Sequence, residues 1–273
     1  MGALRYRSGV TFPALTDPTD PRLDDFRALI DADVRADRRG VVIAEGVNVV
    51  ERLLRSNYRV RAIVGVESKL TALRPTITES APVPVYCLDK WALSDLVGFR
   101  VTRGVLAAAD RPAVADPVEL VDQGRRFVVL EGINDFENLG SIFRNAAAFG
   151  IDGVLLDPRC ADPLYRRSVR VSMGYVFSMP FAVLADPWPQ SLAVLRGAGV
   201  QLLAMTPRAD AKSIGSLAAP PRWAVLLGAE GPGLSEPALE MADEWVRIPM
   251  ADGVDSLNVA TAGAVAMAAL LSS

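Results

Sequence analysis

The sequence predicts an α/β protein in which a smaller α/β domain precedes a larger one with a parallel sheet. Short apolar runs of strand length alternate with segments of helical spacing along both halves of the chain. Such alternation is typical of a sheet covered by helices on both faces. Residues 110–124 contain two prolines and separate the halves. A chain of 273 residues is long enough for two modest domains.

The sequence of the first half predicts an N-terminal arm, a small domain and a linker. Residues 1–22 combine three arginines with three prolines and predict an extended N-terminal arm. A helix is expected over residues 23–38, because apolar side chains recur there on one face. Strands are expected at residues 41–45, 59–66, 83–88 and 103–109, and helices at residues 46–56 and 91–98. The domain is therefore predicted at residues 23–110 and the linker at residues 111–122.

The second half, residues 123–273, predicts the larger domain. Strands are expected at residues 127–130, 153–156, 201–205 and 223–227, with helical stretches such as residues 191–197 between them. This order favours parallel strands joined by helical crossovers.

A strand, a polar loop and a helix follow one another within residues 127–150. The loop EGINDFEN leads to Asn138, Gly140 and Arg144, and Gly150 closes the helix. An amide and a guanidinium at the open end of a parallel strand suit an anion or a sugar. The alternative is an ordinary crossover with a solvated arginine.

A basic cluster lies between two of the predicted strands. Arg166, Arg167 and Arg170 fall within five residues, in or beside a helical segment. The cluster follows an element expected to leave the same sheet edge as Arg144, which favours contact with phosphate groups. A solvated face is the alternative.

Two further stretches predict binding loops. LLGAEGPGLS, residues 226–235, is a buried strand that ends in a turn with three glycines around Glu230. Glycines there let the backbone approach a ligand closely, although no dinucleotide or phosphate-loop fingerprint is present. Residues 248–271 form a polar loop and a helix rich in small side chains, with Asp255 or Ser256 expected as its N-cap.

Composition excludes several kinds of chemistry. The chain has no histidine, so Ser-His-Asp triads and histidine metal sites are excluded. It also has no CxxC pair, which argues against a structural zinc site. Two distant cysteines, Cys87 and Cys160, indicate a reducing, cytoplasmic compartment. No apolar run reaches the ~20 residues that span a bilayer. The net charge of −3 argues against indiscriminate binding of nucleic acid but allows a local basic face.

In this order, the three stretches resemble the motifs of the SpoU (TrmH-like) branch of the SPOUT RNA methyltransferases. The first match is Asn138, Gly140 and Arg144; the second is Gly228, Glu230, Gly231, Gly233, Leu234 and Ser235; the third is Ile248, Pro249, Ser256, Leu257 and Asn258. The resemblance covers residues 123–273. The pieces IAEGVNVVERLL and RGVLA are similar to the RNA-binding domain fused to many of these enzymes, which is akin to kink-turn-binding ribosomal proteins.

The resemblance implies an enzyme that transfers a methyl group from S-adenosylmethionine to a ribose 2′-hydroxyl of RNA, rRNA more than tRNA. It implies a parallel-sheet catalytic domain with a C-terminal trefoil knot, and a homodimer packed through the knot, without metal or membrane. The implied catalytic residues are Arg144, Asn138, Glu230, Ser256 and Asn258. The implied cofactor-binding residues are Thr206, Gly228, Ala229, Gly231, Gly233, Ile248 and Leu257, and the implied RNA-binding residues are Arg166, Arg167 and Arg170.

This sequence departs from the family pattern at three positions. Ala229 stands where many members have a polar residue, and Ala260 replaces a serine often found in the third motif. Some relatives have an arginine at the position of Met173, so Arg170 or Arg167 is expected to take over that contact with RNA. Two alternatives remain open: a nucleotide-dependent α/β enzyme, and a non-catalytic RNA-binding protein that retains the fold.

Overall fold

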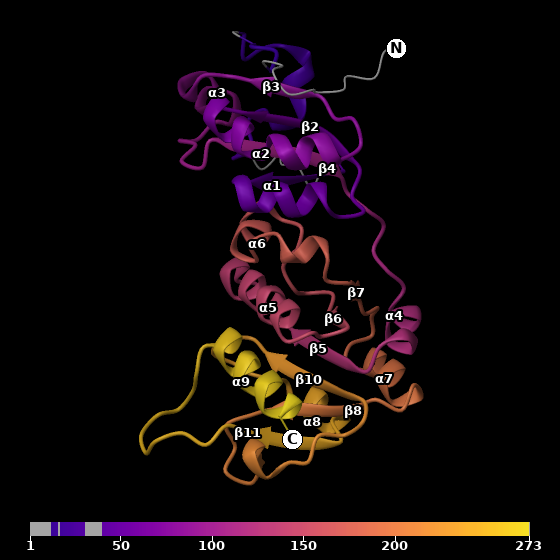
Figure 1. Cartoon of the computed structure of the whole chain (residues 1–273). Helices are drawn as coiled ribbons and strands as arrows, with labels where there is room; N and C mark the ends of the chain where they lie inside the picture. The colour runs from indigo at the N-terminus through magenta and orange to yellow at the C-terminus, as the bar shows by residue number, and fades with distance from the viewer. Residues whose placement is uncertain (1–11, 16, 31–39, 273) are drawn as a thin grey trace. The chain divides into compact units, whose positions relative to one another are not determined.

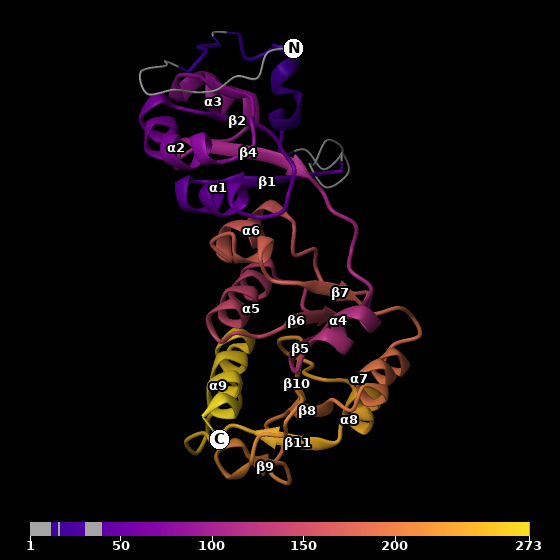
Figure 2. The same ribbon diagram turned by 45° about the vertical axis from the view of Figure 1, so that its right-hand side comes forward.

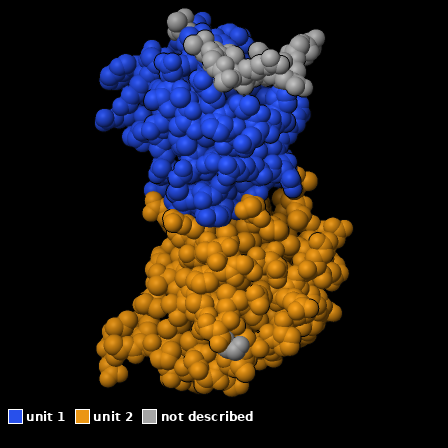
Figure 3. Space-filling model, viewed as in Figure 1, with its two compact units in different colours: residues 1–112, 164–177 blue, residues 113–163, 178–273 orange. Residues whose placement is uncertain are grey.

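The computed structural model describes residues 12–15, 17–30 and 40–272. The chain divides into two compact units, which Figure 3 colours separately. Unit 1 comprises residues 1–112 and 164–177, and unit 2 comprises residues 113–163 and 178–273. Residues 164–177 therefore pack with the first half of the chain, although the sequence pattern places them in the second.

Unit 1 is built on a four-stranded mixed sheet (Figure 1). The strand order is β1 (Val41–Glu45), β4 (Val105–Asp110), β2 (Val60–Gly65) and β3 (Val85–Cys87). β4 runs antiparallel to both of its neighbours, whereas β2 and β3 are parallel. The helices are α1 (Val47–Leu54), α2 (Glu67–Glu79) and α3 (Lys90–Val97). The four predicted strands are confirmed, and α1 and α3 confirm the two helices predicted between them.

The helix predicted over residues 23–38 is wrong within its described part. A short 3₁₀ helix, η1 (Pro21–Phe26), begins after Asp20, whose side chain accepts a hydrogen bond from the Arg22 backbone N–H. It ends because Arg27 is extended, with φ −77° and ψ 134°, and Ala28 has a φ of 49°. Residues 31–39 lie outside the described part of the chain. The apolar residues Leu23, Phe26 and Leu29 are buried together as expected, but they belong to a bent segment and not to a continuous helix.

Residues 164–177 enter unit 1 through α6 (Arg166–Val171) and the 3₁₀ helix η3 (Tyr175–Phe177). Arg52 of α1 donates a 2.7 Å hydrogen bond to the Met173 carbonyl and stacks over the Tyr175 ring. Gly174 has a φ of 81°, and a Cβ there would lie 3.3 Å from the Val49 backbone. This segment is therefore fitted closely to α1.

Unit 2 is built on a seven-stranded sheet in which every pair of neighbours is parallel. The strand order is β7 (Phe181–Val183), β6 (Gly153–Leu156), β5 (Arg126–Glu131), β10 (Trp223–Gly228), β8 (Gln201–Met205), β11 (Glu244–Arg247) and β9 (Lys212–Ser213). The four strands predicted here, and their parallel arrangement, are confirmed. The central strand β10 pairs with β5 and β8, so strand ends that are distant in sequence meet at one edge.

Helices cover both faces of this sheet (Figure 2). α5 (Phe136–Ala148) and α9 (Val259–Leu271) lie on one face; α4 (Pro117–Gln123), α7 (Ala193–Gly197) and α8 (Glu236–Met241) lie on the other. Two 3₁₀ helices, η4 (Gln190–Leu192) and η5 (Ile214–Ser216), complete the unit. α4 falls largely within the stretch expected to be a linker. Small residues bring α9 close to the sheet, because a Cβ on Gly263 would lie 2.8 Å from Leu227.

Within residues 12–15, 17–30 and 40–272, no helix has both the length and the apolar character needed to cross a membrane.

Candidate functional site

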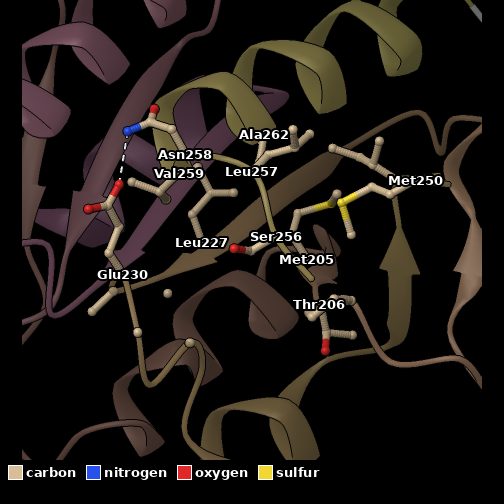
Figure 4. Close-up of a pocket in the computed structure, with 16 residues that line it drawn as sticks. Met205, Thr206, Leu227, Glu230, Met250, Ser256, Leu257, Asn258, Val259 and Ala262 are labelled. Carbon is tan, nitrogen blue, oxygen red and sulfur yellow. Dashed lines mark hydrogen bonds between the residues drawn. The ribbon is translucent and has the colours of Figure 1, made fainter. Parts of the chain in front are cut away.

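A cavity of about 560 Å³ opens at the C-terminal ends of β8 and β10 (Figure 4). Ligands of parallel α/β sheets commonly bind at this edge. Three segments line the cavity: the ends of the two strands, the turn after β10, and the loop that leads into α9. The lining residues are Met205, Thr206, Pro207, Leu227, Gly228, Ala229, Glu230, Gly231, Gly233, Ile248, Met250, Ser256, Leu257, Asn258, Val259 and Ala262.

The turn after β10, residues 229–235, is called the glycine loop here. Ala229 and Gly233 form a β-bridge, and the Gly233 N–H donates a 3.0 Å hydrogen bond to the Ala229 carbonyl. A Cβ on Gly228 would lie 2.4 Å from the Gly233 carbonyl carbon, so only glycine permits this fold of the loop. Gly231 and Gly233 have φ values of 89° and 71°, which side chains rarely adopt. The predicted glycine turn is therefore a tight hairpin beside the cavity.

Asn258 joins the three predicted motifs through its side chain. Its Nδ2 donates hydrogen bonds of 2.7 Å to Asn138 Oδ1 and 2.8 Å to Glu230 Oε1. Figure 4 shows the Glu230 bond beside the cavity. Because Nδ2 has two protons, one amide group can satisfy both acceptors at once. The arrangement fixes the first and second motifs against the start of α9.

The N-cap expected at Asp255 or Ser256 is wrong, because Asn258 caps α9. Its Oδ1 accepts from the backbone N–H groups of Ala260 and Thr261, while φ −50° and ψ 137° keep its own backbone outside the helix. The helix begins at Val259, so Ser256 remains in the loop and lines the cavity. The amide oxygen of Asn258 thus caps α9, and its amide nitrogen binds Asn138 and Glu230.

All residues predicted to bind the cofactor line this cavity, namely Thr206, Gly228, Ala229, Gly231, Gly233, Ile248 and Leu257. Their roles stay a prediction, but the structure brings them to one place. Sequence reasoning missed several apolar lining residues, namely Met205, Leu227, Met250, Val259 and Ala262. Met205 and Leu227 could have been expected because they occupy the last positions of predicted strands that meet at this edge.

Arg144 lies apart from the cavity in a single chain. It is exposed on α5, does not line the cavity and belongs to none of the hydrogen bonds around Asn258. Across the described ranges, no ion pair holds its guanidinium, which is therefore available to an external anion. The structure brings Asn138, Glu230 and Asn258 together and leaves Arg144 outside that cluster.

The three arginines predicted to contact RNA belong to α6 in unit 1, and their environments differ. Arg166 forms a 2.9 Å ion pair with Glu45, which is 3% exposed, and stacks over the Phe99 ring at 4.1 Å. Arg167 is exposed and Arg170 is partly buried. The guanidinium of Arg166 thus has a structural role, and the RNA contacts of all three arginines stay a prediction.

No group of three or more cysteine, aspartate or glutamate side chains is placed to hold a metal ion anywhere in residues 12–15, 17–30 and 40–272.

Residues 125–268 match the SpoU rRNA Methylase family. This match covers more than half of the chain. The protein belongs to the SpoU rRNA methylase family. The resemblance read from the three motifs is thereby confirmed. In this SpoU family protein the second and third motifs line the cavity, and Asn138 of the first motif is bound to them through Asn258.

Relatives extend the similarity to the whole chain. An uncharacterized tRNA/rRNA methyltransferase from Mycobacterium tuberculosis is 46% identical over 268 residues, which is 96% of this chain and 92% of that protein. A 23S rRNA (adenosine(1067)-2'-O)-methyltransferase from Streptomyces azureus is 30% identical over 68% of each chain. The crystal structure of an AdoMet-bound rRNA methyltransferase from Sinorhizobium meliloti superposes with a TM-score of 0.78 at 25% identity, covering 95% of this chain and 97% of that one.

Proposed function

We propose that this SpoU family protein transfers a methyl group from S-adenosylmethionine to a ribose 2′-hydroxyl of structured RNA. The observation that carries the proposal is that the second and third family motifs line the cavity at the ends of β8 and β10, while Asn138 of the first motif is bound to them through Asn258. The names of the relatives support 2′-O-methylation of RNA, with rRNA favoured over tRNA.

The cavity fits S-adenosylmethionine in size and in chemistry. Its volume of about 560 Å³ lies within the ~300–1,000 Å³ typical of small-molecule pockets. Leu227, Ile248 and Leu257 supply apolar walls that suit an adenine ring and a thioether chain. The glycine loop presents backbone groups, and no atom lies within 4 Å of a Cβ built on Gly231 or Gly233, which leaves room for a ligand.

In this mechanism the cofactor supplies an electrophilic methyl group on a sulfonium centre, and the protein positions and stabilises the reacting groups. Asn258 holds Glu230 and Asn138 in fixed relation, so that Asn138 can orient the ribose. Arg144 stabilises the negative charge that develops on the 2′-oxygen as the hydroxyl proton passes to bulk water, and it holds a neighbouring phosphate. A guanidinium has a pKa above ~12 and is therefore a poor general base at neutral pH.

The proposal extends to a trefoil knot and a homodimer. After β11 the chain returns through residues 248–258, and α9 packs against α5, where Asn145 Nδ2 donates a 3.0 Å hydrogen bond to the Ala260 carbonyl. That return past the glycine loop supports a knotted path. Val254, Leu257 and Val265 are between 38% and 48% exposed, although they are apolar, which supports a partner surface beside the cavity. Sedimentation equilibrium should give twice the chain mass, and a monomer would contradict the dimer.

The N-terminal domain and α6 are proposed to bind the RNA. The support is the sequence resemblance of residues 43–54 and 103–107 to an RNA-binding domain, together with the arginines of α6. The contact is expected to come from Arg170 and Arg167 more than from Arg166, because Arg166 already pairs with Glu45.

Two measurements on the full chain test this function. Calorimetry should show that S-adenosylmethionine binds, and incubation with radiolabelled cofactor should label rRNA from cells that lack the gene. Binding of RNA without binding of S-adenosylmethionine would instead identify a non-catalytic RNA-binding protein. Binding of a nucleoside triphosphate in place of S-adenosylmethionine would point to a nucleotide-dependent enzyme.

A further inference from the structure

One buried carboxylate at the C-terminal end of β5 has no role in the steps described so far. Glu131 is 4% exposed and accepts three hydrogen bonds. The Ser235 backbone N–H donates to Oε2 at 2.9 Å, and the Ser235 hydroxyl donates to Oε1 at 2.7 Å. Trp188 Nε1 also donates to Oε1, at 2.7 Å, and the Arg159 guanidinium lies 3.5 Å from the same oxygen.

These contacts place Glu131 at both ends of the glycine loop. Gly228, just before the loop, pairs with Glu131 in the ladder between β10 and β5. Ser235, the last residue of the loop, is held by the Glu131 side chain through two hydrogen bonds. One residue thus fixes where the loop begins and where it ends.

The hydroxyl proton of Ser235 has a defined direction. Its Oγ accepts a 3.3 Å hydrogen bond from the Ala238 N–H and caps α8, so the hydroxyl proton is free to point to Glu131. Four donor groups therefore surround Glu131, and a carboxylate accepts from both of its oxygens. A glutamine at this position would turn one amide N–H toward these donors, so a neutral isostere cannot satisfy all of them.

We propose that Glu131 is a positioning residue for the cofactor, which it affects through Ser235 and the glycine loop. It does not line the cavity, whereas Ala229, Glu230, Gly231 and Gly233 of the loop do. The inference rests on the proposed function, since it assumes that the cavity receives S-adenosylmethionine. A loop held at both ends lowers the ordering cost of binding, so losing one end weakens affinity more than turnover.

The test compares three variants of the full chain, with calorimetry and steady-state kinetics. Glu131→Gln and Ser235→Ala should each raise the Kd and KM for S-adenosylmethionine about tenfold, as expected for the loss of one or two hydrogen bonds. Their kcat at saturating cofactor should stay within about twofold of wild type. The double variant should bind no more weakly than Glu131→Gln alone, because both changes act through one contact.

The matched control is Asp152→Asn at the opposite end of β5. Asp152 Oδ2 accepts hydrogen bonds of 2.7 and 2.9 Å from the backbone N–H groups of Arg125 and Arg126, far from the glycine loop. Asp152 is exposed, and the single side-chain oxygen of asparagine can still accept both bonds, so this variant removes only a carboxylate charge at the other end of the strand and should leave the Kd unchanged.

Each outcome decides one question. Failure of the wild-type protein to bind S-adenosylmethionine would overturn the proposed function itself. Normal binding by wild type together with wild-type Kd in Glu131→Gln would overturn the positioning role. An equal loss of affinity in Asp152→Asn would show general destabilisation and would also overturn it. If Glu131→Gln does not fold, Ser235→Ala carries the same test, because it leaves the buried carboxylate in place.

Discussion

Replacing Asn258 by aspartate should remove its hydrogen bonds within the site while keeping its N-cap of α9. Aspartate is as good an N-cap as asparagine, so the contribution of the cap to the free energy of unfolding should change by less than about 0.5 kcal/mol. The site loses the two hydrogen bonds that Nδ2 donates to Asn138 and Glu230, at 2.7 and 2.8 Å. It also gains a carboxylate directly opposite that of Glu230.

The expected cost to methyl transfer follows from these contacts. Two lost hydrogen bonds contribute about 1 kcal/mol each, and the facing like charges add about 1 kcal/mol at an exposed site. A total of about 3 kcal/mol corresponds to a roughly 100-fold lower rate.

The assay is transfer of radiolabelled methyl groups to rRNA from cells lacking the gene, measured at neutral pH. Thermal unfolding of the same samples shows whether the cap is retained. Asn258→Ala serves as the comparison, because it removes the cap as well and should cost about 1 kcal/mol of stability. A wild-type rate for a folded Asn258→Asp variant would refute the bridging role of this amide.

Four further outcomes are expected. Arg144→Ala should bind the cofactor normally and lose about 10²–10³ in single-turnover rate, with Arg144→Lys partly active; a lysine variant as fast as wild type would instead favour a general base. Gly233→Val should abolish cofactor binding measured by calorimetry, because a β-branched residue resists a φ of 71°. Arg166→Ala should lower stability in thermal unfolding by about 3 kcal/mol, since it leaves the buried Glu45 unpaired. Burial raises the pKa of Cys160 to about 12, so alkylation at pH 8 should be far slower in native than in unfolded protein, and equal rates would contradict that burial.

The sequence predicted the sheet of unit 2 well, for a physical reason. Buried parallel strands are short apolar runs, and Val128 and Leu226 lie within two such runs that pair at the centre of the sheet. The motif residues directly follow strands or precede helices. Because the ends of parallel strands meet at one edge of the sheet, these positions in the sequence indicate where the residues lie. Only the family resemblance predicted that these motifs, which are distant in the sequence, belong to one site.

Other features depend on contacts that no local pattern reveals. Ala28 adopts a φ of 49° where the apolar spacing predicts a continuous helix. α2 has Pro75 inside it, a residue that ordinarily ends a helix, so the local sequence pattern predicts no helix there. The packing of residues 164–177 with unit 1 depends on Arg52 and Glu45, more than 100 positions earlier in the chain. The hydrogen bonds of Asn258 likewise join residues whose separation in sequence hides their contact.

A map of 2′-O-methylated nucleotides in total RNA tests the central claim most directly. The map compares cells that lack the gene with the same cells carrying the wild-type gene or the Arg144→Ala variant. We expect one or a few ribose positions, in rRNA rather than tRNA, to lose methylation in the deletion, to regain it with wild type and to stay unmethylated with the variant. Identical maps in all three strains would contradict the assignment of this protein as an RNA 2′-O-methyltransferase.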